Sequence, residues 1–384
     1  MLNRFKKKIE SVMYDVERSN ENLTDVVLSG LSGCYHKVMQ IRESLYQQEI
    51  KKSYSLPCYV ISVGNITVGG TGKTPMVIYL ARLIKKMGYK PAIVSRGYGG
   101  TASADGGIVS DGQTIMMDPH MAGDEPYMIA EKLLNDSVPV VIGSNRYSAG
   151  LVAVKEFSPD VIILDDGFQH LKLKRDLDIL LFDSTHPIGN GNMLPRGTLR
   201  EPLAAISRAD VFVLTRVDNS AEQAAVKTFH RSVSEFIPVD MITKIPIITS
   251  THRPFVIGSV KPLLKEIKTI EDLNTNLSVY AFSGIAKNHE FRKTAVSMGF
   301  SIKGFSEFQD HHSYTENDCK DLIGSAEKSG ATVLITTEKD YVKIADLDLD
   351  FELIIIGIDI DFGSSEELFS DLIKMKILKS RGDV

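Results

Sequence analysis

The residues with the clearest chemistry form a glycine-rich loop at positions 67–74, with the sequence Thr-Val-Gly-Gly-Thr-Gly-Lys-Thr. An apolar run at 59–63 leads into the loop and a helical pattern at 75–87 follows it, which is the context that a phosphate-binding P-loop requires. Glycines let backbone N–H groups converge on phosphate oxygens. Lys73 would reach the β- and γ-phosphates of a nucleotide, and Thr74 would hold Mg²⁺. Because the usual pattern has glycine where Thr67 stands, the loop is a variant, and the competing interpretation is a chance glycine-rich turn.

Two further acidic positions favour phosphoryl transfer. Asp165 and Asp166 directly follow the apolar run 161–164, so we expect them at the carboxyl end of a buried strand, where a P-loop enzyme makes its second Mg²⁺ contact. The alternative is a strand-end turn. Asp124 begins a helical stretch and is a candidate general base for a hydroxyl acceptor. Its alternative is an ordinary helix N-cap, with Pro126 near the first helical position.

Basic residues and histidines occupy other predicted loops. Arginines at four such positions suit bidentate phosphate recognition, although any one alone would be a surface charge. They are Arg96, Arg146, Arg196 and Arg200. Asp310 precedes the adjacent pair His311 and His312, which could bind a metal or tune a base. A polar turn is the simpler interpretation of these three residues, and a metal-dependent phosphoesterase centred on them is a further hypothesis.

The elements that must position these residues follow from the apolar pattern. Short apolar runs occur at 59–63, 92–95, 138–142, 161–164, 179–182 and 211–215, and again at 279–282, 333–336 and 353–356. Helical stretches separate many of them, which predicts an α/β fold with a buried parallel sheet of the P-loop type and a second, smaller α/β domain. The predicted divisions are an amphipathic helical segment at 1–50, a P-loop domain at 51–220, an extended linker at 221–274 and the smaller domain at 275–384.

Composition sets limits on the class of protein. Of 384 residues, 43% are hydrophobic and 24% are charged, as in ordinary globular proteins, and three cysteines are too few for a disulfide framework. We therefore expect a reducing, cytoplasmic compartment. The net charge of −5 gives no indication of nucleic-acid binding. Residues 1–50 combine apolar positions at helical spacing with a basic cluster at 4–8, which fits either a docking helix or a helix in a membrane interface.

In their order along the chain, these motifs resemble the tetraacyldisaccharide 4′-kinase family. The resemblance is carried by the loop with its flanks (63–75), by Ser-Arg-Gly-Tyr-Gly (95–99), Gly-Asp-Glu-Pro (123–126) and Asp-Asp-Gly-Phe-Gln-His (165–170), and by 194–202, 308–312 and 337–340. It covers roughly residues 22–360. The first ~20 residues extend beyond the family's usual start, and residues 283–289 match its glycine-rich turn only loosely.

The resemblance implies an ATP- and Mg²⁺-dependent transfer of the γ-phosphoryl group to the 4′-hydroxyl of a tetraacylated disaccharide 1-phosphate, in lipid A synthesis at the cytoplasmic face of the bacterial inner membrane. It implies Asp124 as base, assisted by His311 with His312 also possible, with Lys73 also catalytic and with Thr74, Asp165 and Asp166 at the metal. The implied nucleotide contacts are Thr67, Val68, Gly69, Gly70, Thr71, Gly72, Lys73 and Thr74. The implied substrate contacts are Arg96, Tyr98, Glu125, Arg146, Gln169, His170, Arg196 and Arg200.

The implied partners are the lipid precursor and the membrane surface, with no nucleic acid and no obligate protein partner. A nucleotide-switch protein is the alternative hypothesis, because residues 67–74 also resemble the loop of such ATPases. The sequence Thr-Arg-Val-Asp at 215–218 is faintly similar to a guanine-binding motif.

Overall fold

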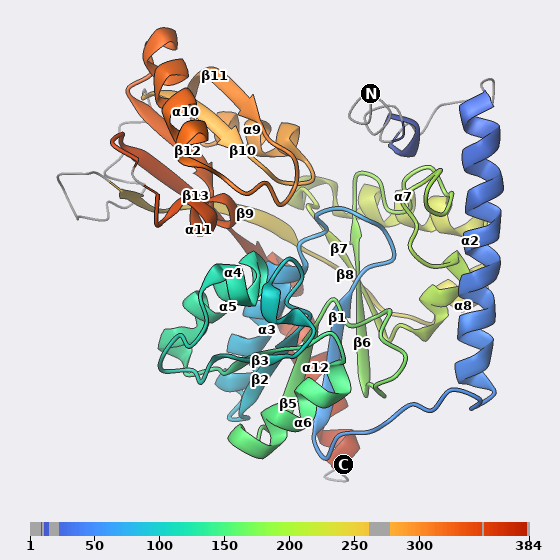
Figure 1. Cartoon of the computed structure of the whole chain (residues 1–384). Coiled ribbons are helices and arrows are strands. Elements are labelled where there is room, and N and C mark those ends of the chain that lie inside the picture. Colours follow the sequence, from blue (N-terminus) through green and yellow to red (C-terminus); the bar gives the residue numbers. More distant parts are fainter. Residues whose placement is uncertain (1–8, 10, 15–22, 261–276, 348, 382–384) are drawn as a thin grey trace. The chain divides into compact units, whose positions relative to one another are not determined.

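The computed structural model describes residues 9, 11–14, 23–260, 277–347 and 349–381 (Figure 1). The described residues group by their contacts into two units, and each unit combines segments that are distant in sequence. The first takes in residues from Met1–Arg96, Gly143–His252 and Ile360–Val384, and the second takes in Gly97–Ile142 and Arg253–Asp359. The basic cluster at 4–8 lies outside the described residues. The domain boundaries expected from the sequence stay a prediction.

A parallel sheet forms the centre of the first unit. Its strands run in the order β2-β5-β1-β6-β7-β8, and each neighbouring pair is parallel. Their bounds are β1 Tyr59–Gly64, β2 Pro91–Ser95, β5 Val161–Asp165, β6 Leu177–Asp183, β7 Val211–Thr215 and β8 Ile247–Thr249. Nearly every residue in them is buried, which explains why these strands appear in the sequence as continuous apolar runs.

Helices complete the first unit: α2 Leu23–Gln47, α3 Lys73–Lys86, α6 Arg146–Phe157, α7 Glu222–Ser234, α8 Val239–Ile242 and α12 Glu366–Arg381. Helix α3 begins directly after the glycine-rich loop. Pro75 lies in its first turn, where a missing N–H costs no helical hydrogen bond. The strand β1, the loop and α3 therefore form the predicted P-loop arrangement.

Helix α2 has two apolar faces. One packs on the first unit: Leu28 is buried, Ser32 Oγ donates to Met193 O at 2.8 Å, and Tyr35 Oη donates to Arg200 O at 3.0 Å. The other face carries large apolar side chains that are 52–82% exposed, namely Leu23, Val26, Val27, Leu31, Val38 and Ile41. We call these six residues the exposed α2 face. Among the described residues, no helix is long and apolar enough to cross a membrane.

The second unit holds a sheet in the order β11-β10-β12-β13-β9 and also the strands β3 and β4, which pair antiparallel. The strands are β3 Gly107–Ser110, β4 Val140–Ile142, β9 Thr251–Val260, β10 Ser278–Ser283, β11 Ser301–Glu307, β12 Val333–Thr337 and β13 Leu353–Asp361. The helices are α4 Pro119–Ala122, α5 Asp124–Leu133, α9 Asn288–Ser297, α10 Glu316–Ser329 and α11 Glu338–Ile344.

The fold class expected from the sequence, an α/β protein with a P-loop-type parallel sheet, is confirmed. The interpretation of residues 221–274 as an extended linker needs correction. This stretch contains α7, α8, β8 and all of β9, while residues 261–276 lie outside the described part. Helix α7 is amphipathic and buries Phe229 and Val233 in the core of the first unit, so these residues are part of a packed layer.

Candidate functional site

The glycine-rich loop is held in shape by contacts within the first unit. The Asn65 Nδ2 group donates to Thr71 Oγ1 at 2.9 Å, and Thr215 Oγ1, at the end of β7, donates to Thr71 O at 3.0 Å. Gly72 has a φ of 85°, and a Cβ there would lie 2.6 Å from His252 Nε2. Only glycine satisfies both conditions. His252 in turn accepts a hydrogen bond from Arg216 Nε at 3.3 Å.

Charged side chains meet at the mouth of this loop. Arg200 makes a bidentate ion pair with Asp166, at 2.9 Å from Nη1 to Oδ2 and 2.8 Å from Nη2 to Oδ1. Lys73 Nζ lies 3.9 Å from Asp166 Oδ1 and 3.4 Å from Asn65 Oδ1. Asp166 has a positive φ of 52°, a conformation that non-glycine residues adopt mainly where the surrounding structure holds them. The structure therefore brings Lys73, Asp166 and Arg200 together.

The electrostatics of this group keep Asp166 ionised. Burial raises the pKa of its carboxyl, but the charges of Lys73 and Arg200 and the hydrogen bond from Arg200 outweigh burial. The net pKa of Asp166 lies far below the ordinary aspartate value. Asp165 is buried beside it, and its Oδ2 accepts a hydrogen bond from Ser95 Oγ at 2.9 Å. The Asp166 carboxylate is thus an anion at neutral pH.

The donor set suits Mg²⁺. Thr74 offers a hydroxyl, and Asp165 and Asp166 offer carboxylate oxygens, which are hard ligands of the kind Mg²⁺ prefers. Across the described residues no cluster of three or more His, Cys, Asp or Glu side chains forms a metal cage. A nucleotide kinase does not need such a cage, because Mg²⁺ takes one or two carboxylates and completes its shell with phosphate oxygens and water.

Other predicted contacts lie near the same strand ends. Arg146 begins α6 and is 5% exposed. Its Nη1 donates to Gly143 O at 3.3 Å, and burial lowers its pKa to about 10. Burial and the neighbouring Arg146 lower the pKa of His170 to about 4, so its imidazole is neutral at physiological pH. Gln169 Nε2 donates to Asn65 O at 2.7 Å.

Three predicted contacts lie elsewhere. Arg96 follows β2 and is exposed. Arg196 is half-buried in the loop before Arg200, where its Nη1 lies 3.5 Å from Asn192 Oδ1. Tyr98 belongs to the second unit, where its ring meets His311 edge-on with centroids 5.2 Å apart.

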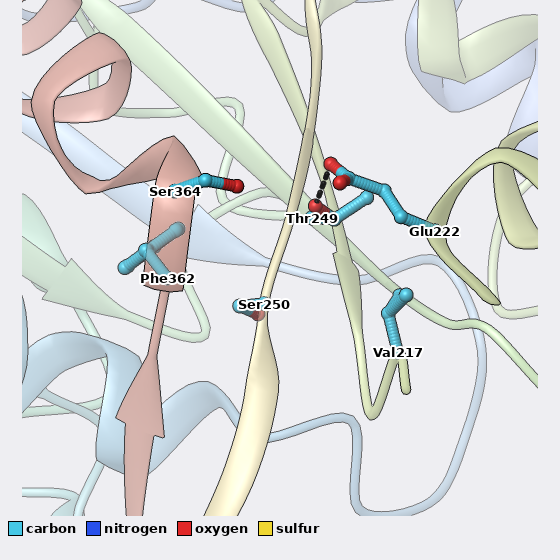
Figure 2. Close-up of a pocket in the computed structure, with 6 residues that line it drawn as sticks. All are labelled: Val217, Glu222, Thr249, Ser250, Phe362 and Ser364. Carbon is cyan, nitrogen blue, oxygen red and sulfur yellow. Dashed lines mark hydrogen bonds between the residues drawn. The ribbon is translucent and has the colours of Figure 1, made fainter. Parts of the chain in front are cut away.

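A cavity of about 270 Å³ opens at the carboxyl ends of β7 and β8. It is lined by Val217, Glu222, Thr249, Ser250, Phe362 and Ser364 (Figure 2). Thr249 Oγ1 donates to Glu222 Oε1 at 2.5 Å. Ligands of open α/β sheets bind outside the carboxyl ends of the strands, which is where this cavity lies.

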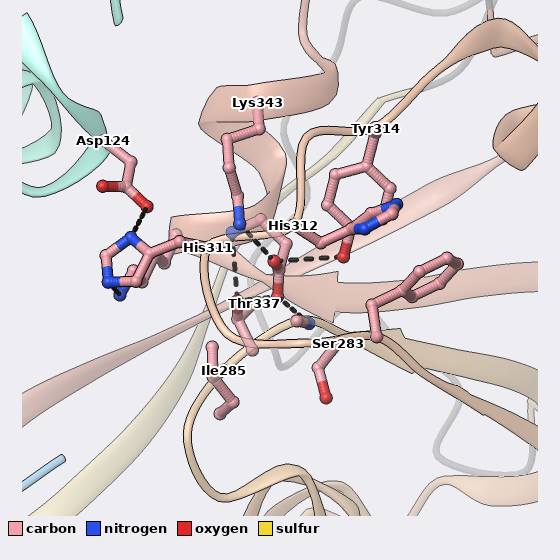
Figure 3. A network of polar contacts seen from close by, with 12 residues as sticks. Asp124, Ser283, Ile285, His311, His312, Tyr314, Thr337 and Lys343 are labelled. Carbon is pink, nitrogen blue, oxygen red and sulfur yellow. Dashed lines mark hydrogen bonds and ion pairs between the residues drawn. The ribbon is translucent and has the colours of Figure 1, made fainter. Parts of the chain in front are cut away.

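The second unit holds a carboxylate–histidine pair. His311 Nδ1 lies 3.1 Å from Asp124 Oδ2 (Figure 3), and Asp124 is 7% exposed. Gly123, with a φ of 89°, is the N-cap of α5, and Asp124 is the first helical residue rather than the cap. His312 instead contacts Asp318 Oδ2 at 3.3 Å. Of the two adjacent histidines, the structure therefore places His311 against the candidate base.

Asp124 and His311 shift each other's pKa in opposite directions. Burial raises the pKa of Asp124, but the hydrogen bond from His311 and the positive charge of Lys339 outweigh it, so the net pKa lies below the ordinary value. The hydrogen bond to Asp124 raises the pKa of His311 above its ordinary value, although burial and Lys339 oppose this rise. His311 also has a positive φ of 59°, which is consistent with a side chain fixed by its surroundings.

Sequence reasoning missed three residues that organise these sites. Asn65 is fully buried and contacts Lys73, Thr71 and Arg200. Its signal was its position directly after the strand and before the glycines. Arg42 of α2 donates to Gln169 O at 2.6 Å, and Lys339 contacts both Glu125 and His311. The local sequence carries no signal for these two residues. The contacts of Arg42 with Gln169 and of Lys339 with Glu125 each span more than 100 positions, and the contact of Lys339 with His311 depends on the turn at 311.

Comparisons with known proteins place the chain in a family. The profile of the family described as tetraacyldisaccharide-1-P 4′-kinase matches residues 24–377. A tetraacyldisaccharide 4′-kinase of Desulfatibacillum aliphaticivorans is 40% identical over 384 residues, covering 98% of this chain and 99% of the relative. The namesake of Syntrophus aciditrophicus is 41% identical over 331 residues, covering 84% and 85%. The crystal structure of LpxK from Aquifex aeolicus in complex with ATP is similar with a TM-score of 0.69 and 34% identity, over 92% of this chain and 100% of that one. This chain belongs to the tetraacyldisaccharide-1-phosphate 4′-kinase family.

Proposed function

We propose that this protein transfers the γ-phosphoryl group of ATP to the 4′-hydroxyl of a tetraacyldisaccharide 1-phosphate, a precursor of lipid A. The observation that carries the proposal is the buried pair of Asp124 and His311. A P-loop alone would serve any nucleotide hydrolase or switch. A buried carboxylate oriented by a histidine supplies what an alcohol-phosphorylating enzyme needs in addition, namely a base for the hydroxyl proton.

ATP would bind through the loop at 67–74. The converging backbone N–H groups and the N-terminus of α3 favour phosphate there, and Lys73 reaches the terminal phosphates. The cavity at the ends of β7 and β8 would take the adenine base, because it opens beside the strand whose Thr215 supports the loop. Mg²⁺ would be held by Thr74 with Asp165 and Asp166, and when bound it would neutralise charge on the transferred phosphoryl group.

Arg200 forms an ion pair with Asp166, a proposed Mg²⁺ ligand, at the place where the phosphate would bind. Its guanidinium fork can pair with phosphate oxygens as well as with a carboxylate. We infer that Arg200 exchanges part of its contact with Asp166 for the nucleotide or the substrate. Arg146 and Gln169 lie close by and would fix the anionic end of the substrate.

For the acceptor, Asp124 would take the proton of the sugar hydroxyl as the oxygen attacks phosphorus. His311 Nδ1–H donates to the other side of the same carboxylate and fixes its orientation. Glu125 and Tyr98, on the same unit, would contact the sugar.

The acceptor is a lipid, and α2 offers a surface for it. Its exposed face presents six large apolar side chains in a row at helical spacing. A helix with such a face lies in a membrane interface with its apolar side in the headgroup and acyl boundary. We propose that the protein binds peripherally to the cytoplasmic face of the inner membrane through this face.

The test is transfer of radiolabelled phosphate from ATP to the disaccharide 1-phosphate in mixed micelles with Mg²⁺. Wild type should label the lipid, and Lys73→Ala should not. Asp124→Ala should lower the rate about 10²–10⁴-fold, the usual range for a general base, while keeping its affinity for ATP. Absence of a labelled lipid from a wild type that binds nucleotide tightly would instead favour the nucleotide-switch hypothesis.

A further inference from the structure

Lys339 lies among the charged groups around His311. It is the second residue of α11, directly after Thr337 as N-cap and Glu338, and its side chain is 17% exposed. Its Nζ lies 2.9 Å from Glu125 Oε1, 3.3 Å from His311 Nε2 and 3.4 Å from Asp310 Oδ1. A cation in the first turn of a helix is disfavoured by the helix dipole. Contacts with these three partners, rather than the helix, therefore hold the ammonium in this position.

The contact with Lys339 limits where the imidazole of His311 carries its proton. An ammonium group has three donors and no lone pair, whereas a neutral imidazole has one donor nitrogen and one acceptor nitrogen. Since Nε2 faces Nζ at 3.3 Å, Nε2 must be the acceptor. The proton then lies on Nδ1, and this N–H donates to Asp124 Oδ2 at 3.1 Å.

The other groups that face His311 do not favour the opposite tautomer. Asp310 Oδ1 is the other acceptor candidate for an Nε2–H, but it lies 3.9 Å from Nε2, beyond hydrogen-bonding distance, and it contacts Lys339 instead. Tyr98 meets the imidazole edge-on, with ring centroids 5.2 Å apart. The groups that determine the state of His311 are therefore Asp124, Asp310, Lys339 and the ring of Tyr98.

We propose that Lys339 is a positioning residue for the phosphotransfer reaction. Lys339 fixes His311 as the tautomer protonated on Nδ1, and His311 in turn orients the Asp124 carboxylate toward the sugar hydroxyl. The inference rests on the proposed role of Asp124 as base. Glu125 and Asp310 complete the arrangement, because they keep Lys339 charged. Their carboxylates outweigh the effect of burial and hold the pKa of Lys339 above the ordinary lysine value.

The first test reads the tautomer without any reaction. The full chain is labelled with ¹⁵N-histidine, and long-range nitrogen–proton correlations report which ring nitrogen carries the proton. The His311→Gln variant identifies the His311 signals. We expect wild type to carry the neutral-state proton on Nδ1. A wild-type spectrum with Nε2–H as the main form would overturn the proposal, and this arm needs no variant of Lys339.

Variants of the lysine then test the cause. Lys339→Met removes the donor that faces Nε2, so part of His311 should shift to the Nε2–H tautomer, and its titration midpoint should rise because a nearby like charge is removed. Lys339→Arg keeps a donor-only cation and should keep the Nδ1 form. Lys343→Met is the matched control: this lysine lies one turn further along α11 and pairs with Asp340 at 2.9 Å, so its loss should leave the tautomer unchanged. An unchanged tautomer and midpoint in Lys339→Met would overturn the proposal.

Kinetics separate this inference from the proposed function. Lys339→Met should lower kcat about 10²-fold with little change in KM, as expected for a misplaced reacting group, and Lys339→Arg should recover most of the loss. If the expected tautomer is found in a protein that phosphorylates no lipid, the proposed function fails and the assignment of Lys339 to the reaction fails with it. If the lipid is phosphorylated but Nε2 carries the proton, only the inference about Lys339 fails.

Discussion

A single methyl group at Gly72 should weaken ATP binding, and a second glycine of the same helix provides the control. Gly72 precedes α3 and Gly88 follows it, with φ values of 85° and 88°. A side chain at either position has to adopt a left-handed conformation, which costs roughly 1–2 kcal/mol. The two sites differ in their surroundings. A Cβ at Gly72 would lie 2.6 Å from His252 Nε2, whereas nothing lies within 4 Å of a Cβ at Gly88.

The expected loss follows from what can move. His252 accepts a hydrogen bond from Arg216, and Arg216 is held by the buried Asp183 at 2.6 Å, so the imidazole cannot shift freely. In Gly72→Ala the loop must move instead, and its N–H groups lose alignment with the phosphates. The loss of one hydrogen bond to a charged group costs about 1.5–3 kcal/mol, which corresponds to a roughly 10–100-fold weaker affinity for ATP.

Isothermal titration with ATP is the assay. Gly88→Ala should bind ATP like wild type while losing about 1 kcal/mol or more of stability, because it carries only the backbone strain. The double variant Gly72→Ala/His252→Ala should recover part of the affinity, since it removes the close contact and keeps the strain. Equal ATP affinities for Gly72→Ala and Gly88→Ala would refute the reasoning. Failure of the double variant to recover would show that the contact with His252 is not the cause.

Three further outcomes are expected. The kcat/KM of wild type should rise with pH as His311 loses its proton, at a pKa above the ordinary histidine value, because the imidazolium holds Asp124 more tightly and makes it a weaker base. His311→Gln should lose this rise with pH. Leu31→Glu, on the exposed α2 face, should reduce sedimentation with anionic vesicles and leave ATP affinity unchanged; the exposed Val152→Glu on α6 is the control. Ser250→Phe should fill the cavity in Figure 2 and weaken binding of ATP but not of inorganic triphosphate. Equal losses of affinity for both ligands would mean that adenine binds outside this cavity.

Much of the first sheet could be predicted because its signals are local. The apolar run at 59–63 is β1, the run at 179–182 lies within β6, and the pattern at 75–87 is α3 to within two residues. Strands buried on both faces need continuous apolar sequence, so their positions are visible without any partner. The short strand β3 and the half-buried β11 have mixed patterns and were not predicted.

The candidate sites could be predicted only as residue types at strand ends. The contact between Asp124 and His311 spans 187 positions, and the sequence favoured His311 only through the family resemblance, with His312 still possible. What separates the two histidines is the positive φ of His311 and the contact of His312 with Asp318, and both depend on the folded turn. The grouping of Gly97–Ile142 with Arg253–Asp359 has the same origin, because packing between distant segments leaves no mark in a local pattern.

The direction of the Asp124 pKa bears on how the proposed reaction works. A general base is most effective when its pKa lies near the working pH, yet the environment of Asp124 moves its pKa further down. The surroundings therefore do not make this carboxylate a stronger base. Phosphoryl transfer has a loose transition state, in which little negative charge needs to develop on the attacking oxygen before the bond to phosphorus forms. For such a reaction, orientation contributes more than basicity. The hydrogen bond from His311 and the charge of Lys339 would then serve to hold one carboxylate oxygen in place, at the cost of a lower proton affinity that the reaction can tolerate.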